Sequence, residues 1–340
     1  MKITFIHDVS DFNALSDVWN DLLNRSITDV PFLRYEYQSI WWKTLGGGEW
    51  KTGELWIGVG RNNGGGLTGL APLFLSRTIE GKSALMFLGS YEISDYLDLI
   101  VPDNDVREFT EALLAALDNH GPKDWESLDL YNIPEGSPSL GALEDAARRR
   151  GWEITRERIA PCPAISLDNT WEEYLARLVK KQRHEVRRKL RRAAEHPSGV
   201  SWQLIGPDED IEPLMEIFMN LMATDPKKTD FLTPAMHTQF LHSMQAAQEN
   251  GWLHLSFLKV GRDYAAGYLC FDYGGRLWVY NSGLNPAYLS LSPGWVLLSH
   301  LIQWAIENDR KEFDFLRGDE KYKYRFGGVD RYIARLTISR

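Results

Sequence analysis

The predicted strands and helices of this chain occur in the same order twice. In each half a short strand and two helices precede a run of three strands, and a further helix then leads to one more strand. That last strand reads WESLDL at residues 125–130 and KEFDFL at 311–316. Helices mixed with strand meanders predict α/β domains, each a mixed sheet with helices on both faces. We therefore expect two domains of one topology, at residues 1–165 and 166–340, a size that suits the roughly 100–200 residues of a typical domain.

Composition excludes several other classes of protein. Hydrophobic residues make up 44% of the chain and charged residues 25%, which is an ordinary globular balance. A mostly disordered chain, a collagen-like chain and a disulfide scaffold are thereby excluded. The net charge of −9 argues against a surface that binds nucleic acid as a whole.

The cysteines and the N-terminus indicate the compartment. Cys162 and Cys270 are isolated, and no CxxC or HExxH motif occurs, so we expect no metal site. Two isolated thiols suit a reducing compartment. The first residues do not resemble a signal peptide, and no run of about 18 apolar residues is present. We expect a cytoplasmic protein without membrane insertion.

One segment between the halves is strongly basic. Residues 177–192 contain nine Lys or Arg, and the stretch 171–195 carries a charge of +5 while the rest of the chain carries −14. Its apolar residues recur on one side of a predicted helix. Two interpretations stay open: a solvated amphipathic helix, or an anion site for a phosphate-rich ligand that includes Lys181 and Arg183.

A second candidate site begins where a predicted strand ends in YNSG at residues 280–283. A loop then leads to a long apolar helix, for which Ser292 suits the N-cap and Pro293 the first helical position. Free N–H groups at such a helix start, including that of Gly294, bind phosphate. The alternative interpretation is that this tripeptide only starts a helix.

Polar residues crowd the end of the strand that follows this helix. Ligands favour the carboxyl ends of strands in α/β sheets. Asp314 is a candidate base or structural hydrogen-bond acceptor, and Glu320 is a candidate base for a nucleophile. Tyr322 suits proton donation to a leaving thiolate, and Lys323 suits a phosphate or carboxylate. The alternative is a surface turn with salt bridges.

The stretch 280–326 resembles the C-terminal half of the acetyltransferase family associated with cellulose and exopolysaccharide biosynthesis. The family pattern there is a strand ending in Ser-Gly, then Ser-Pro-Gly at a helix start, then Asp-Phe-x-x-Gly-x-x-x-Tyr-Lys, and all three elements are present. A more diffuse similarity spans about residues 30–330. It includes Lys181, Arg183, Arg187, Arg188, Pro31, Phe32, Trp41, Ala71, Pro72, Leu73 and residues 94–98.

This family belongs to the GNAT superfamily and is related to the Fem-type peptidyltransferases. The resemblance implies two tandem GNAT-like domains, of which the first is expected to be degenerate and the second to hold the donor site. It also implies an acyltransferase that moves an acyl group, most simply acetyl, from acyl-CoA to an amine or hydroxyl of a sugar or cell-surface polysaccharide precursor. The implied catalytic residues are Asp314, Glu320 and Tyr322, the cosubstrate-binding residues Ser282, Ser292, Pro293, Gly294, Lys181 and Arg183, and the acceptor-binding residues Asp95, Tyr96, Asp98, Tyr280 and Lys323.

One departure from the superfamily leaves alternatives open. The usual pyrophosphate loop, R/Q-x-x-G-x-G/A, is absent, and residues 292–294 stand in its place. A Fem-like aminoacyltransferase that uses charged tRNA is therefore a second hypothesis, and the basic segment supports it. A non-catalytic module of a polysaccharide-synthesis complex is a third. The acceptor and the oligomeric state stay open.

Overall fold

The computed structural model describes residues 1–78 and 81–340, and the chain divides into two compact units. Unit 1 comprises residues 1–160 and 331–340, and unit 2 comprises residues 161–330. The boundary near residue 160 lies close to the expected one. The last ten residues, which the sequence-based division placed in the second domain, belong to unit 1 because they form a strand of its sheet.

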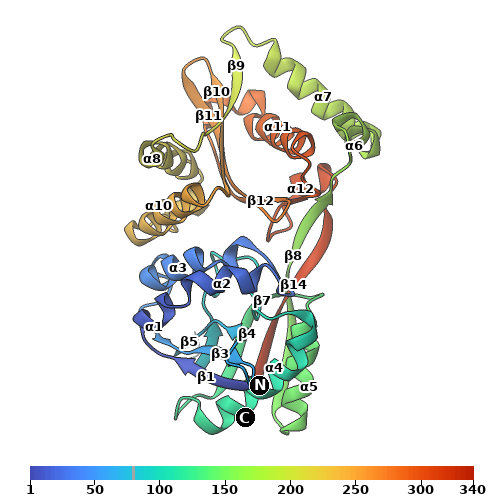
Figure 1. Cartoon of the computed structure of the whole chain (residues 1–340). Helices are drawn as coiled ribbons and strands as arrows, with labels where there is room; N and C mark the ends of the chain where they lie inside the picture. The colour runs from blue at the N-terminus through green and yellow to red at the C-terminus, as the bar shows by residue number, and fades with distance from the viewer. Residues whose placement is uncertain (79–80) are drawn as a thin grey trace. The chain divides into compact units, whose positions relative to one another are not determined.

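Unit 1 is a mixed α/β unit (Figure 1). Its own strands are β1 (Lys2–Ile6), β2 (Glu54–Leu55), β3 (Ile57–Arg61), β4 (Leu67–Ala71), β5 (Leu73–Arg77), β6 (Ser83–Phe87) and β7 (Ser127–Pro134). Its α-helices are α1 (Val9–Asn13), α2 (Ser16–Leu23), α3 (Tyr35–Gly48), α4 (Val106–His120) and α5 (Pro138–Arg149), with short 3₁₀ turns at Pro31–Leu33 and Asp103–Asp105. The β6–β7 pair is parallel, whereas the other strand pairs of this unit that have a described register are antiparallel.

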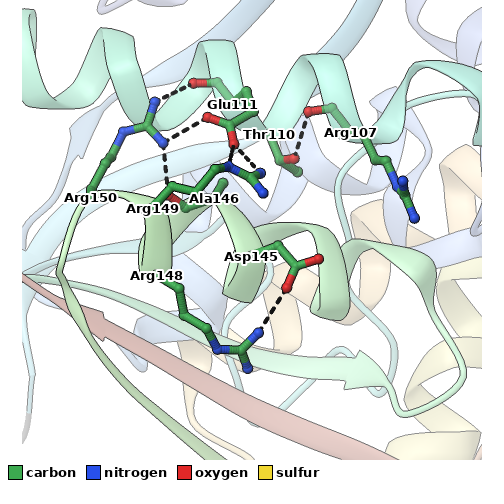
Figure 2. Close-up of polar contacts among 8 residues, drawn as sticks. All are labelled: Arg107, Thr110, Glu111, Asp145, Ala146, Arg148, Arg149 and Arg150. Carbon is green, nitrogen blue, oxygen red and sulfur yellow. Dashed lines mark hydrogen bonds and ion pairs between the residues drawn. The ribbon is translucent and has the colours of Figure 1, made fainter.

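Helices α4 and α5 are joined by arginines at the end of α5 (Figure 2). Arg150 donates to a carboxylate oxygen of Glu111 at 2.8 Å and to the Glu111 carbonyl oxygen at 3.0 Å. Arg149 pairs with the same carboxylate. These hydrogen bonds hold the pKa of Glu111 below its ordinary value, with Arg150 as the largest cause.

Unit 2 is also a mixed α/β unit. Its strands are β9 (Val200–Leu204), β10 (Leu253–Val260), β11 (Asp263–Tyr273), β12 (Arg276–Leu284) and β13 (Glu312–Asp314). Its helices are α6 (Trp171–Arg177), α7 (Lys180–Ala194), α8 (Ile211–Met222), α9 (Pro226–Thr229), α10 (Pro234–Glu249), α11 (Pro293–Glu307) and α12 (Lys321–Arg325), with a 3₁₀ segment at Pro286–Leu291. Helices cover both faces of its sheet, because Gly283 of β12 lies against the backbone of α8 while its neighbour Leu284 contacts the start of α11.

Two long strands each pair with a strand from the other half of the sequence. β8 (Glu153–Ser166) follows α5 of unit 1, but its residues 164–166 pair antiparallel with β13 of unit 2. β14 (Val329–Ser339) follows α12 of unit 2 and pairs antiparallel with β7 of unit 1. The buried Asp129 of β7 fixes this second pairing by accepting hydrogen bonds from Arg335 at 2.7 and 2.9 Å.

The expected repetition is visible in the order of strands. In unit 1, Trp56 alone separates β2 from β3, and Pro72 alone separates β4 from β5. When each of these pairs is counted as one interrupted strand, the order is β1, β2/β3, β4/β5, β6, β7, β14. In unit 2 the order is β9, β10, β11, β12, β13, β8. Each series has its one parallel pair at the same place, β6–β7 or β12–β13. The predicted mixed α/β fold class is confirmed.

Two local features differ from a simple pattern. Asp8 is the N-cap of the first helical segment, accepting from the Asp11 N–H at 2.9 Å, and the segment forms two helices, α1 and α2. The expected strand at 312–316 ends at Asp314, because Leu316 adopts a φ of +57°. Among the described residues, no helix combines the length and apolar composition that crossing a bilayer requires.

Candidate functional site

Strands β12 and β13 of unit 2 part shortly after they begin to pair. Their parallel register covers only residues 276–278 of β12 and 312–314 of β13. Beyond that point β12 continues to Leu284 with β11 as its partner on one side. A β-bulge at Tyr280 marks the change, since Leu269 faces Asn281 while Cys270 faces Val279. One edge of β12 is therefore left for other groups, and most of the predicted site residues lie around it.

Two of these residues build the turn after β13. Asp314 is buried, and its carboxylate accepts from the Leu316 N–H at 2.7 Å. The buried Lys323 ammonium donates to the carbonyl oxygens of Leu316, Arg317 and Gly318 at 2.8–3.1 Å. Because these three carbonyls and the Glu320 carboxylate at 2.9 Å surround it, Lys323 holds the turn together. Asp314 acts here as a hydrogen-bond acceptor within the turn. Its role in catalysis and the role of Lys323 in substrate binding stay predictions.

The side chain of Glu320 is more accessible to solvent than those of Asp314 and Lys323. It is the N-terminal flanking residue of α12, its side chain is 57% exposed, and a Cβ on Gly318 would lie within 2.5 Å of its carboxylate. Gly318 has a φ of +119°, which favours glycine at this position beneath the carboxylate. Glu320 is thus held at the surface of the turn by Lys323.

Tyr322 and Tyr268 are two phenols of the same region. Burial raises the pKa of Tyr322 above its ordinary value, and Glu320 raises it further. Burial likewise raises the pKa of Tyr268, which forms a hydrogen bond with Ser282 across the β11–β12 pair. The charge of an ionised Tyr322 further raises the pKa of Tyr268, so the two phenols lie near one another. Both phenols stay protonated at neutral pH, which suits proton donation and not base catalysis.

Lys228 of α9 is a site residue that sequence reasoning missed. Its ammonium donates to the Asn281 side-chain oxygen at 2.7 Å and to the Ser282 carbonyl oxygen at 2.6 Å. Burial lowers its pKa, while Asp225 and Glu320 oppose that shift. A signal was present, because Asp225-Pro226 caps and starts a helix, but the four-residue helix shows no periodicity.

The start of α11 offers fewer free N–H groups than expected. Pro293 is the first helical residue, as predicted, but Ser292 is in the left-handed region and makes no side-chain cap. The Ser292 N–H donates to Leu289, and that of Trp295 donates back to Ser292. Within the described chain, the Gly294 N–H is thus the one donor of residues 292–294 that has no partner. The Tyr268 hydroxyl would lie 3.7 Å from a Cβ at Gly294, so this N–H belongs to the same region.

Helix α7 carries two of the predicted cosubstrate-binding residues. Lys181 is exposed, and Arg183 donates to the Ala176 carbonyl oxygen at 3.0 Å. The α7 residue that reaches the start of α11 is Lys189, whose ammonium lies 4.0 Å from the ring centroid of Trp295. That ring in turn lies 4.7 Å from the ring of Phe326, just after α12. The start of α11 and the end of α12 are therefore neighbours.

The residues of the first half that were predicted to bind the acyl acceptor lie in unit 1. Asp98 is fully buried and accepts from the hydroxyls of Thr28, Ser137 and Ser139 at 2.5–2.6 Å and from the Leu99 N–H. Its carboxylate therefore serves the fold of unit 1, and its contact with an acceptor stays a prediction. Tyr96 is buried, and Asp95 is half-buried.

Tyr280 of β12 packs against two aromatic rings of unit 2. Its ring lies 5.0 Å from that of Phe271 and 5.7 Å from that of Phe240 on α10. Among residues 1–78 and 81–340, no group of His, Cys, Asp and Glu is arranged to hold a metal ion. The residues gathered at the open edge of β12 are thus Ser282, Lys228, Gly294, Glu320, Tyr268 and Tyr322.

Comparison with known families identifies the site-bearing part of the chain. Residues 180–324 match the family model described as an acetyltransferase (GNAT) domain. This GNAT domain lies within unit 2 and runs from the start of α7 into α12, so it contains every residue gathered at the open edge of β12. No curated protein matches the chain.

Solved structures share the fold over almost the whole chain. FemX has a TM-score of 0.68 at 12% identity, covering 99% of this chain and 97% of its own. A conserved protein of unknown function from Bacteroides thetaiotaomicron has a TM-score of 0.66 at 13% identity, covering 99% and 100%. The C-terminal domain of a putative lysylphosphatidylglycerol synthetase from Agrobacterium fabrum has a TM-score of 0.57 at 10% identity, covering 97% and 93%. At these identities the likeness establishes the fold.

Proposed function

We propose that the GNAT domain is an acyltransferase that moves an acyl group, most simply acetyl, from CoA to an amine or hydroxyl of a sugar or polysaccharide precursor. One observation carries the proposal: the segment 180–324 that matches the family contains the place where β12 and β13 separate. The strand edge left at 279–284 is bordered by a protonated phenol, a carboxylate and an unpaired helix N–H.

The residues present fit the acyl end of an acyl-CoA better than its phosphates. CoA supplies an activated thioester when it is bound. Its acyl end suits the edge of β12, where the phenols of Tyr268 and Tyr322 lie. Its phosphates suit the start of α11, where one free N–H and Lys189 supply positive potential. A single N–H is fewer than a phosphate loop offers, so we expect the cations to carry more of the phosphate binding.

The proton transfers can be assigned to residues of α12. Glu320 accepts the proton of the attacking amine or hydroxyl, because its carboxylate is exposed and already held by Lys323. Tyr322 donates a proton to the leaving sulfur when the carbon–sulfur bond breaks, because its raised pKa keeps the hydroxyl protonated. The acceptor thereby gains the acyl group, and free CoA thiol is the second product.

A thiol-release assay tests this function. The full chain is incubated with acetyl-CoA and a panel of amino sugars and sugar precursors, and free thiol is measured. We expect release that depends on an acceptor, reduced about 100-fold by Tyr322→Phe and by Glu320→Gln. Asp319→Asn is the matched control, because that exposed carboxylate is next to Glu320 in the chain. Release that is absent with every acceptor, or equal in all four proteins, would refute the proposal.

The second candidate is aminoacyl transfer from charged tRNA, as in Fem-like enzymes. Two observations favour it: the fold shared with FemX over 99% of this chain, and the basic helix α7. It predicts tRNA binding that weakens steeply as salt rises. If tRNA binding is absent or insensitive to salt, this candidate is eliminated. If both assays are negative, the remaining hypothesis is a non-catalytic module.

A further inference from the structure

A hollow of about 410 Å³ lies beside the second half of α7 in unit 2. Its walls come from α7, the edge strand β9 and helix α11. The lining residues are Leu190, Arg191, Ala193, Ala194, Val200, Ser201, Trp202 and His300. None of these is among the residues gathered at the open edge of β12, so the hollow is a separate feature of the domain.

Half of the eight lining residues are aliphatic. Leu190, Ala193, Ala194 and Val200 present methyl groups, and the ring of Trp202 lies parallel to that of His300, with centroids 5.7 Å apart. Burial lowers the pKa of His300, so the imidazole is neutral at neutral pH. A hollow of this kind takes up an apolar chain and gives a polar group little to bind.

The rim of the same hollow is cationic. Arg191 contributes to the lining, and Arg192 is exposed beside it on the same helix. In the described parts of the chain, neither guanidinium has a carboxylate partner, and the same holds for the exposed Lys180 and Lys181 at the start of α7. By contrast, Arg187 and Arg188 pair with Glu172 and Glu185.

One side of α7 packs against the core of unit 2, and the other, outer side is exposed. Val186 and Ala193 are buried in the core that α11 shares, and Figure 1 shows α7 running along unit 2 with one side uncovered by other elements of that unit. Val179, at the start of the helix, is 68% exposed. Free cations and exposed apolar surface are thus combined on one helix, while the rest of the chain is acidic.

We propose that the outer side of α7 and the adjacent hollow dock on an anionic lipid surface. The four unpaired cations contact phosphate head groups, and one acyl chain enters the aliphatic hollow. The four aliphatic side chains of the hollow favour an acyl chain, because they give a polar group little to bind. This inference does not depend on the proposed acyl transfer.

Vesicle flotation of the full chain tests the proposal. One set of vesicles is phosphatidylcholine alone, and the other contains about one third phosphatidylglycerol. We expect flotation with the anionic vesicles only. Arg191→Glu/Arg192→Glu is expected to weaken it by at least about tenfold. Lys43→Glu/Lys51→Glu changes the net charge by the same amount at exposed lysines of unit 1 and is expected to float like wild type.

A second variant tests the hollow. Ala194→Phe fills part of the space without changing charge, and we expect it to remove the part of vesicle binding that persists at high salt. Circular dichroism of each variant confirms that the fold is kept. Equal flotation with both vesicle types, no difference between the two charge variants, or wild-type behaviour of Ala194→Phe would overturn the proposal. So would salt-sensitive tRNA binding without any vesicle binding.

Discussion

The ammonium group of Lys228 lies 2.6 Å from the carbonyl oxygen of Ser282. Ser282 is on the edge of β12 that β13 leaves, and its N–H is satisfied by the side chain of Asn281 at 2.9 Å. Lys228 also holds that side chain at 2.7 Å. One lysine from a four-residue helix therefore keeps the open strand edge in shape where the proposed cosubstrate would bind.

We predict that Lys228→Met lowers both the rate of acyl transfer and the stability of the protein. Two acceptors lose a charged donor, which costs about 2 kcal/mol of unfolding free energy. The transfer rate at low acyl-CoA concentration is expected to fall at least about tenfold, because the strand edge loses its fixed geometry. Lys227→Met removes the exposed neighbouring lysine and is the control. An unchanged rate in Lys228→Met would contradict this role.

Lys323→Met is expected to act mainly on stability. The buried ammonium satisfies three carbonyl oxygens and one carboxylate, and its removal leaves all of them without this donor. We expect a loss of about 3 kcal/mol in denaturant unfolding. Lys321→Met, two residues earlier and exposed, should unfold like wild type. If Lys323→Met kept full stability but lost acceptor affinity, the original assignment to substrate binding would be correct.

His254 should make the protein sensitive to acid. Burial lowers its pKa from 6.5 to about 4, and its Nε2 has no hydrogen-bond partner in the described chain. Between these pH values the unfolded chain binds a proton that the folded chain does not, so stability falls as pH drops from about 6.5 to 4. The full effect is about 3 kcal/mol. Unfolding titrations of His254→Phe should lack this slope, while the exposed His120→Gln should retain it. Identical slopes in all three proteins would refute the assignment.

Gly283 should tolerate no side chain. A Cβ there would lie 2.5 Å from backbone atoms of Leu221 and Met222, and backbone cannot move aside as a side chain can. Gly283→Ala is expected to cost about 2 kcal/mol or more. Gly141→Ala places a Cβ in open space within α5 and is expected to stabilise by up to about 1 kcal/mol. Thermal unfolding of the two variants should therefore shift in opposite directions, and a common direction would count against the packing described.

Local signals in the sequence were enough to predict the repeated element order and the start of α11. Pro293 and the apolar run behind it are short-range features, and the structure places the helix where they indicate. The sequence left Asp314 between base and structural acceptor, and the structure adds one hydrogen bond that it accepts, from the Leu316 N–H.

Features set by distant parts of the chain were not predictable in the same way. The pairing of β14 with β7 joins residues about 200 positions apart, which no periodicity reveals. Lys323 was interpreted as a substrate contact because an ammonium suits a phosphate or carboxylate, and Asp98 because the family resemblance implies it. Their actual partners, backbone carbonyls and hydroxyl groups, become visible only once the chain is folded.

Hydrogen exchange with and without saturating acetyl-CoA tests the central claim most directly. The account predicts slower amide exchange in peptides that cover residues 279–296 and 314–324, with less protection in Lys228→Met. Protection confined to unit 1, or no change in either segment at any concentration of acetyl-CoA, would contradict it.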